Sequence, residues 1–227
     1  MKWNVYHFDC LKSTNDTARS YPPNSVIVAA EQTAGRGRLG RVWQSKRGNL
    51  FLSAVVPDYG PQTPLLAFVA GLAVGDALAD FGVRLKWPND VLLNGGKVCG
   101  ILLERTEENH IIVGIGVNVA VAPQAGMMYQ TACLNGAITV QEAEERVLKA
   151  LERNLNDWEK NGFEPIRNRW LAKAAGLNEN VKVNLPDIQI TGVFKDLSPQ
   201  GELVLETPDK TVQKIVAGDV FLTGNEK

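Results

Sequence analysis

Six short apolar runs rich in β-branched residues lie between residues 25 and 119, and they limit the folds that the chain can adopt. Such runs are typical of strands buried in a sheet. They occupy residues 25–30, 49–56, 83–87, 90–94, 97–104 and 110–119. A turn at Asn94-Gly95-Gly96 joins the fourth run to the fifth as a hairpin. The sequence therefore predicts a β-sheet built from these strands.

Two helices are expected among these strands. A strand-like segment at 5–8 leads into Ser13, which suits the N-cap of a short helix that runs to about Tyr21. A long apolar helix follows the second apolar run. Thr63 is its expected cap, Pro64 suits its first position and Gly82 lies just past its end.

Two further helices are expected after the sheet. Thr139 and Glu142 have the spacing of a capping box, so a helix should span 140–160. Its apolar residues recur at steps of three and four, at Ala143, Val147, Leu151, Leu155 and Trp158. The next helix should span about 164–175 and end at Gly176.

The end of the chain has a different pattern, with short alternating strands separated by Pro, Gly and Asp turns. These strands are expected at 181–185, 188–194, 201–206 and 211–216, and they predict a small β-barrel. The expected fold class is therefore α+β. A mixed β-sheet with helices packed on it should occupy residues 1–178, and the small C-terminal β-barrel should occupy residues 179–227.

Composition excludes several classes of function. The 227 residues carry 24 basic and 25 acidic side chains, so no general basic field would hold the protein on nucleic acid or on an anionic membrane. The sequence shows neither a membrane-length apolar run nor a signal peptide, and we expect a cytoplasmic protein. The three cysteines are too far apart for a disulfide framework or a zinc spacing, and the two histidines do not suggest a nucleophilic triad.

The most unusual motif is EQTAGRGRLGRVW at residues 31–43, and we call residues 35–43 the glycine–arginine loop. Its G-x-G-x-x-G spacing suggests a dinucleotide-binding turn, but a strand rather than a helix follows it. A Walker A loop is also excluded, because Arg41-Val42 stands where Lys-Ser/Thr is required.

A flexible backbone with three fixed cations is well suited to bind an anion. Arg36, Arg38 and Arg41 should repel one another without a ligand, so we expect a loop that is disordered when empty and closes over an anion, with Trp43 as its lid. An exposed basic turn is the plainer alternative. An arginine-rich RNA contact is a third, disfavoured by the neutral charge and the lack of interleaved aromatics.

Three other segments carry weaker signals. Residues 86–90, KWPND, interrupt what would otherwise be one long apolar strand. Lys97 opens a nearly apolar strand, where it either reaches solvent or meets a negative ligand. Gly114 and Gly116 remove side chains from one strand face, as expected for a flat ring or another backbone packed closely, or for a strand crossing.

Taken in order, these segments resemble the biotin protein ligases. The resemblance rests on Ser13-Thr14-Asn15, the stretch from Glu31 to Arg41, KWPNDV at 86–91, KVCGILLE at 97–104 and GIGVNV at 114–119. It implies a class II synthetase-like catalytic domain of the biotin/lipoate ligase type and an SH3-like C-terminal barrel. It also implies that biotin and ATP, with Mg²⁺, give biotinyl-5′-adenylate and pyrophosphate. Biotin is then passed to one lysine of the biotin carboxyl carrier protein of acetyl-CoA carboxylase or a related carboxylase.

The resemblance also assigns residue roles, with Arg38 and Lys97 as the catalytic pair. Biotin would be bound by Ser13, Thr14, Asn15, Gln32, Gly35, Arg36, Gly37, Arg38, Lys97 and Gly100. ATP would be bound by Arg38, Arg41, Trp43, Lys86, Asn89 and Asn118. Asp90 would orient Mg²⁺, held mainly by phosphates.

Two alternatives remain open at this stage: a lipoate ligase-like enzyme that forms an acyl adenylate, and a non-catalytic biotin or nucleotide sensor. Some family members carry an N-terminal helix-turn-helix domain, but here the match begins within the first fifteen residues, so operator binding by that route is not expected. Family members often dimerise through sheet edges, and the sequence leaves a homodimer open.

Overall fold

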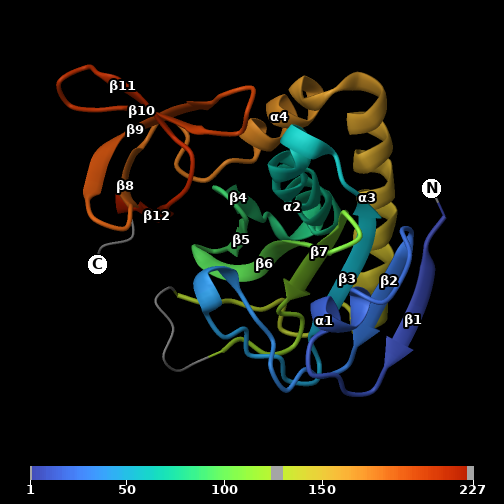
Figure 1. Ribbon diagram of the computed structural model, residues 1–227. Helices are drawn as coiled ribbons and strands as arrows, with labels where there is room; N and C mark the ends of the chain where they lie inside the picture. Colours follow the sequence, from blue (N-terminus) through green and yellow to red (C-terminus); the bar gives the residue numbers. More distant parts are fainter. Residues whose placement is uncertain (1, 124–129, 224–227) are drawn as a thin grey trace.

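A seven-stranded mixed sheet forms the centre of the computed structural model, which describes residues 2–123 and 130–223 (Figure 1). The strand order is β1-β2-β3-β7-β6-β5-β4. The β1–β2 pair is parallel and the other five pairs are antiparallel. The strands are β1 (Asn4–Phe8), β2 (Ser25–Ala29), β3 (Leu50–Pro57), β4 (Arg84–Lys86), β5 (Asp90–Leu93), β6 (Gly96–Arg105) and β7 (His110–Val117). The predicted mixed sheet is confirmed.

Alternation along β3 and β7 divides the sheet into two faces. One face packs on the helices through residues such as Leu52, Val113 and Ile115. The other face carries Ser53 opposite Gly114 and Phe51 opposite Gly116. Because this second face has small residues at its centre, it leaves room above the sheet.

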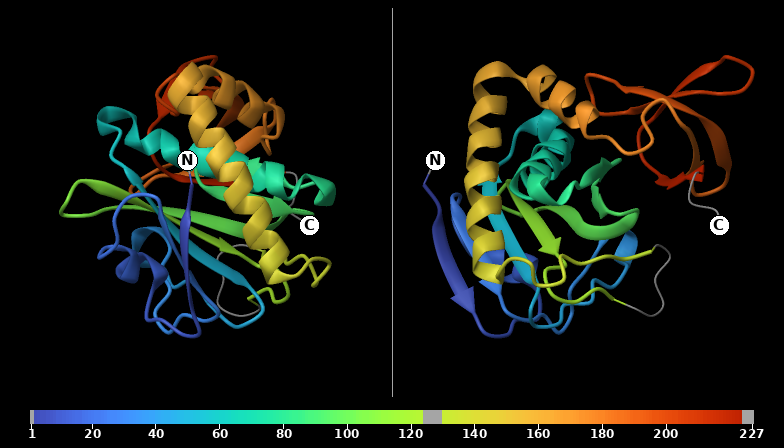
Figure 2. Two further views of the ribbon diagram at one scale, coloured as in Figure 1. Left: turned by 90° about the vertical axis from the view of Figure 1, so that its right-hand side faces the viewer. Right: turned by 180° about the vertical axis from the view of Figure 1, so that it is seen from behind.

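Three helices cover the first face of the sheet. They are α2 (Leu66–Ala77), α3 (Val140–Asn161) and α4 (Phe163–Ala172). Figure 2 shows these helices on one side of the sheet, and α1 (Thr14–Ala18) with the glycine–arginine loop on the other side. The capping box of Thr139 and Glu142 is confirmed, and the five apolar positions predicted for α3 are buried. The α4 helix stops at Ala172, shortly before the predicted end.

The start of the first long helix was predicted wrongly. Residues Gly60–Leu65 form a 3₁₀ helix that includes Pro64, and the α-helix begins only at Leu66. Thr63 does not cap it, because its hydroxyl donates to Asp58 and accepts from the Tyr59 N–H. The predicted end is also displaced, because α2 ends at Ala77, and Gly82, with φ of 68°, follows a separate short 3₁₀ helix, Ala79–Phe81.

Two turns between strands agree with the sequence. The β5–β6 hairpin turns at Asn94 and Gly95, with φ of 50° and 81°, as predicted. KWPND separates β4 from β5, as predicted. It also reverses the chain, so that Lys86 pairs with Asp90 across the two strands. The α1 helix has the predicted Ser13 cap but ends at Ala18 rather than near Tyr21.

The C-terminal part is a five-stranded antiparallel sheet in the order β11-β10-β9-β8-β12. Its strands are β8 (Asn180–Asn184), β9 (Gln189–Leu197), β10 (Leu203–Glu206), β11 (Val212–Ile215) and β12 (Asp219–Leu222). The small antiparallel unit is confirmed, and β12 is a strand that the sequence did not predict. In the described part of the chain, β11 and β12 are the edges of this sheet. The division into domains at 178/179 stays a prediction.

The C-terminal sheet lies at the opposite end of the molecule from β1 (Figure 1). Trp87 Nε1 donates to the Gly201 carbonyl at 3.0 Å, and Arg167 contacts Asp196 and the Leu197 carbonyl. The apolar core is continuous between the two sheets. Among the described helices, none is long and apolar enough to cross a membrane.

Candidate functional site

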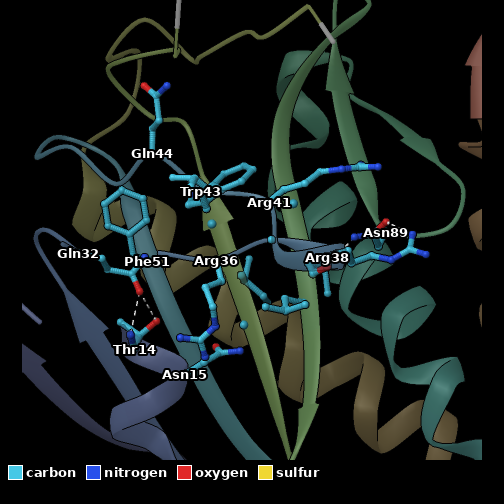
Figure 3. A pocket seen from close by; sticks show the side chains of 18 of the residues that line it. Thr14, Asn15, Gln32, Arg36, Arg38, Arg41, Trp43, Gln44, Phe51 and Asn89 are labelled. Atoms are coloured by element: carbon cyan, nitrogen blue, oxygen red, sulfur yellow. Dashed lines mark hydrogen bonds between the residues drawn. The ribbon is translucent and has the colours of Figure 1, made fainter. Parts of the chain in front are cut away.

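A cavity of about 460 Å³ lies on the face of the main sheet that the three long helices leave uncovered. Its walls come from α1, the glycine–arginine loop, the β4–β5 turn, three neighbouring strands and the start of β12 (Figure 3). The lining includes these predicted site residues: Ser13, Thr14, Asn15, Gln32, Arg36, Gly37, Arg38, Arg41, Trp43, Asn89, Asp90, Lys97 and Gly100. Residues from distant parts of the sequence therefore meet in one pocket.

One end of the pocket is lined by uncharged polar groups that hold one another in place. Gln32 accepts from the Thr14 N–H at 2.8 Å, as Figure 3 shows, and donates to Ser45 at 2.8 Å. Ser53, which is fully buried, lies 2.8 Å from the Thr14 hydroxyl and 2.5 Å from Asn15 Oδ1. This end of the pocket presents fixed donors and acceptors at the start of α1.

Arg36 is held by acidic side chains at this same end. Its guanidinium makes a two-pronged contact with Asp16, at 2.7 and 2.8 Å, and lies 3.3 Å from both oxygens of Glu104. The Arg36 guanidinium lowers the pKa of Asp16, and Asp16 together with Glu104 raises the pKa of Arg36. Arg36 is thus fixed beside the pocket rather than left in a repulsive cluster.

The other two arginines point toward different partners. Arg38 donates to Asn89 Oδ1 at 3.0 Å, in the β4–β5 turn, and Arg41 makes an ion pair with Asp219 of β12. The repulsion expected from the sequence is thereby offset, because each arginine of the loop faces an acceptor. Whether the loop orders only on ligand binding stays a prediction.

The opposite end of the pocket holds two lysines around one buried carboxylate. Lys97 Nζ lies 2.5 Å from Asp90 Oδ1, and Lys86 Nζ lies 3.5 Å from Oδ2. Lys86 is 6% exposed, and burial lowers its pKa while Asp90 opposes the shift. Lys97 lines the cavity with its ammonium 5.4 Å from the Trp43 ring centre, so it does not simply extend into solvent. Two cations and a carboxylate form a charged end that suits an anionic ligand.

Asp90 does not fit the role of a Mg²⁺ ligand. Its carboxylate already contacts two ammonium groups, which occupy the positions that a cation would need. Among residues 2–123 and 130–223, no cluster of three or more His, Cys, Asp or Glu side chains could hold a metal.

Flat groups cover the glycines of β7, as the sequence predicted. A side chain at Gly116 would lie 2.5 to 2.9 Å from the Trp43 indole, and one at Gly114 would overlap the Asn15 amide. Gly100 lies opposite Gly116 on β6 and also faces Trp43. Trp43 therefore packs on the sheet and forms a wall of the pocket. It does not lie over the pocket as the expected lid.

Three predicted site residues lie beside the cavity rather than on its surface. Gly35 leaves space for Ser45 and the Trp43 carbonyl, and Lys86 is buried behind Asp90. Asn118 donates to the carbonyls of Lys97 and Ala132, so it fixes the start of β6.

Sequence reasoning missed several residues that shape the pocket. Phe51 could have been found, because it lies opposite Gly116 on the strand next to the glycine-rich one. Glu104 ends the KVCGILLE segment as its one acid, which was a signal of a polar role. Asp219 had no local signal, since it reaches the pocket only through the placement of the C-terminal sheet.

Comparison with known proteins identifies the class. Residues 7–118 match the biotin/lipoate A/B protein ligase family, and residues 176–223 match the biotin protein ligase C-terminal domain. The chain is similar to the biotin–[acetyl-CoA-carboxylase] ligase of Paracoccus denitrificans, with 37% identity over 93% of this chain and 98% of the relative. It is also similar to the bifunctional ligase/repressor BirA of Bacillus subtilis, with 34% identity over 96% of this chain and 73% of the relative.

A solved structure supports the same class. The biotin protein ligase from Aquifex aeolicus in complex with biotin and ATP superimposes with a TM-score of 0.82 at 30% identity, covering 96% of this chain and 98% of that one. The chain therefore belongs to the biotin protein ligase family.

Proposed function

We propose that this protein makes biotinyl-5′-adenylate from biotin and ATP in the pocket and then transfers biotin to a lysine of a carrier protein. Its activity is that of an ATP-dependent biotin protein ligase. The observation that carries the mechanism is that one cavity joins two different ends. One end has amides and hydroxyls, with Arg36 paired to Asp16 and Glu104, and the other end has Arg38 and Lys97. This charge distribution suits a molecule with an uncharged ring system and a carboxylate.

The uncharged end of the pocket would bind the ureido ring of biotin. Ser13, Thr14, Asn15 and Gln32 line it, and their amides and hydroxyls match a group with one carbonyl and two N–H donors. The fused ring and the aliphatic chain would lie along Gly100, between Trp43 and Phe51.

The charged end would bring two anions together. The biotin carboxylate attacks the α-phosphorus, the bond to the β-phosphate oxygen breaks and pyrophosphate leaves. Arg38 and Lys97, which line the pocket, would neutralise the carboxylate and the developing charge on the phosphate, and Gly37 would let the backbone approach closely. No enzyme nucleophile is needed. In the second step the lysine amine attacks the acyl carbon and AMP leaves.

The remaining predicted residues would hold ATP. Asn89 and Arg41 line the pocket beside Arg38, and Trp43 lies between the two ends. Lys86 would act through Asp90, and Asn118 would act by fixing the strand that carries Lys97. Arg36 and Gly35 would shape the loop rather than touch the phosphates.

The partner and location follow from this activity. Relatives are named for acetyl-CoA carboxylase, so we assign the carrier to that enzyme or to a related biotin-dependent carboxylase. The need for ATP favours the cytoplasm. Dimerisation stays a prediction, for which the outer edge of β1 is an unpaired edge of the described main sheet.

Pyrophosphate exchange tests the first half-reaction. The purified protein should exchange labelled pyrophosphate into ATP, with Mg²⁺ present, when biotin is added, but not with lipoate or with neither acid. Exchange that requires lipoate and does not occur with biotin would show that the protein is a lipoate ligase. Absence of exchange with either acid would favour a sensor.

Two substitutions test the proposed catalytic pair. Arg38→Ala and Lys97→Ala should each lower biotin-dependent exchange by about ten- to a hundredfold, because each removes a charged contact worth about 1.5–3 kcal/mol. Lys46→Ala, an exposed cation after the loop, is the matched control and should exchange normally. Normal rates in both pocket variants would refute these roles.

A further inference from the structure

Glu104 contacts Asn15 and Arg36, two residues that line the pocket, but no role was predicted for it from the sequence. It stands near the end of β6, and its Oε2 accepts from Asn15 Nδ2 at 2.6 Å. Resting on the proposed function, we propose that Glu104 is a positioning residue that fixes the orientation of the Asn15 amide. Asn15 then presents an N–H donor, and not its carbonyl, to the ureido group of the substrate.

The first step of the argument is the chemistry of the carboxylate. An ionised Glu104 can only accept hydrogen bonds, so the atom of Asn15 that faces it at 2.6 Å must be the amide nitrogen. The carbonyl oxygen of Asn15 then faces Ser53, whose hydroxyl lies 2.5 Å away. Both sides of the amide are therefore held by a partner of the right kind.

The second step is that the neighbouring hydroxyls do not fix this direction themselves. In one arrangement Ser53 donates to Asn15 Oδ1, and Thr14 donates to Gln32, which lies 3.0 Å away. With the Asn15 amide reversed, Asn15 Nδ2 would donate to Ser53, Ser53 would donate to Thr14, and Thr14 would still donate to Gln32. Both arrangements use each proton once. Because hydroxyls can rotate, only the carboxylate selects between them.

The third step is that the carboxylate and the amide are both confined. Glu104 lies 3.3 Å from Arg36, which Asp16 also holds, and Arg19 lies 3.6 Å away. The Asn15 amide lies against Gly114, where any side chain would overlap it. Asn15 is 5% exposed, so bulk water does not compete for its two ends.

The consequence concerns the second hydrogen on Asn15 Nδ2. Glu104 takes one hydrogen, and the other is available to the cavity that Asn15 lines. A ureido carbonyl oxygen can accept it. A cyclic guanidinium in the same position offers only donors and would face a donor, so Glu104 indirectly selects a carbonyl over an imino group.

The test uses two ligands that differ at this one atom, biotin and 2-iminobiotin, whose cyclic guanidine is charged at neutral pH. Glu104→Gln keeps the size of the side chain but lets it donate or accept, so the Asn15 amide can reverse. Calorimetry should show biotin binding weakened by about tenfold, and the preference for biotin over 2-iminobiotin reduced by at least about fivefold.

The sign of this change separates the proposal from simple electrostatics. Removing a carboxylate near a cationic ligand would by itself raise the preference for neutral biotin. A preference that stays the same or grows would therefore overturn the proposal. The apparent KM for ATP and the exchange rate at saturating biotin should stay within about twofold, because Glu104 does not touch the reacting atoms.

Three further variants complete the binding experiment. Glu104→Asp keeps an acceptor-only group and should keep the wild-type preference. Glu108→Gln, in the β6–β7 turn and 77% exposed, is the matched control and should bind both ligands normally. Ser53→Ala should weaken both ligands alike, because Glu104 still holds the amide.

Measurements on the wild-type protein distinguish a failure of the proposed function from a failure of the role proposed for Glu104. If it binds no biotin and exchanges no pyrophosphate, the proposed function fails. If it binds biotin but Glu104→Gln keeps the wild-type preference, only the role of Glu104 fails.

Discussion

Gly116 is the residue whose missing side chain lets Trp43 lie on the sheet. We predict that Gly116→Ala displaces the indole, because the added methyl would lie 2.5 Å from Trp43 Nε1. Overpacking of this kind costs about 1–3 kcal/mol, so biotin affinity should fall by about tenfold while the sheet stays folded. Titration calorimetry and circular dichroism measure the two effects.

A second glycine provides the control for this substitution. Gly71 lies inside α2, and a methyl there would meet its nearest neighbours at 3.5 and 3.6 Å, which is ordinary contact. Gly71→Ala should keep full biotin affinity and at least wild-type stability, since alanine is the better helix former. Equal affinity in both variants would mean that Trp43 does not shape the ligand site.

At the scale of residues, the sequence indicated which side chains line the pocket, but it did not indicate which residues those side chains contact. The close packing against the two glycines of β7 was predictable, because a strand rarely has two glycines on one face. The partners of the arginines were not predictable. Arg36 meets Asp16, and Arg41 meets Asp219 from the far end of the chain, and no local pattern encodes such pairings.

At the scale of elements, the glycine–arginine loop is tied to β12 by the Arg41–Asp219 ion pair. We predict that Asp219→Asn loosens the loop, because an uncharged amide has only one oxygen to accept from the Arg41 guanidinium, whereas the carboxylate has two. Both side chains are partly exposed, so the loss is about 1 kcal/mol. Limited trypsin digestion should cut after Arg38 or Arg41 severalfold faster, and biotin with ATP should slow the cutting again.

Asp209→Asn serves as the comparison, because Asp209 lies in the β10–β11 turn of the same small sheet and contacts Thr207 and Thr211. Its cleavage pattern should match that of the wild type. Identical cleavage of the Asp219 variant, with and without ligands, would show that the loop is held by other contacts.

The elements that the sequence predicted well are those with a strong period. Strands buried on both faces and the amphipathic α3 helix follow directly from their apolar patterns. The start of α2 was mistaken, because Thr-Pro is an ordinary helix start and only the competing Asp58 contact shows otherwise. The β12 strand has three apolar residues in a row and therefore shows no alternation, so this strand depends on its pairing with β8.

At the scale of the whole molecule, the mixed sheet with helices packed on it was predictable from the order of the strands and helices. What could not be predicted is that the C-terminal sheet completes the pocket wall at Asp219. This depends on how the two sheets meet. Val181 and Phe194 from the small sheet belong to the same buried cluster as Phe68 and Trp170 from the helices.

Because the two sheets share one core, we predict that they unfold together. Gly201 lies against Phe68 and accepts from Trp87, so the small sheet cannot separate without exposing apolar surface from the large one. Urea unfolding followed by tryptophan fluorescence and by far-UV circular dichroism should give coincident single transitions. Trp87→Phe should lower the free energy of unfolding by about 1–2 kcal/mol through loss of the hydrogen bond, with the two curves still coincident. An early fluorescence change at urea concentrations where the circular dichroism is still native would mean that the C-terminal sheet separates first, and that Asp219 can leave the pocket without global unfolding.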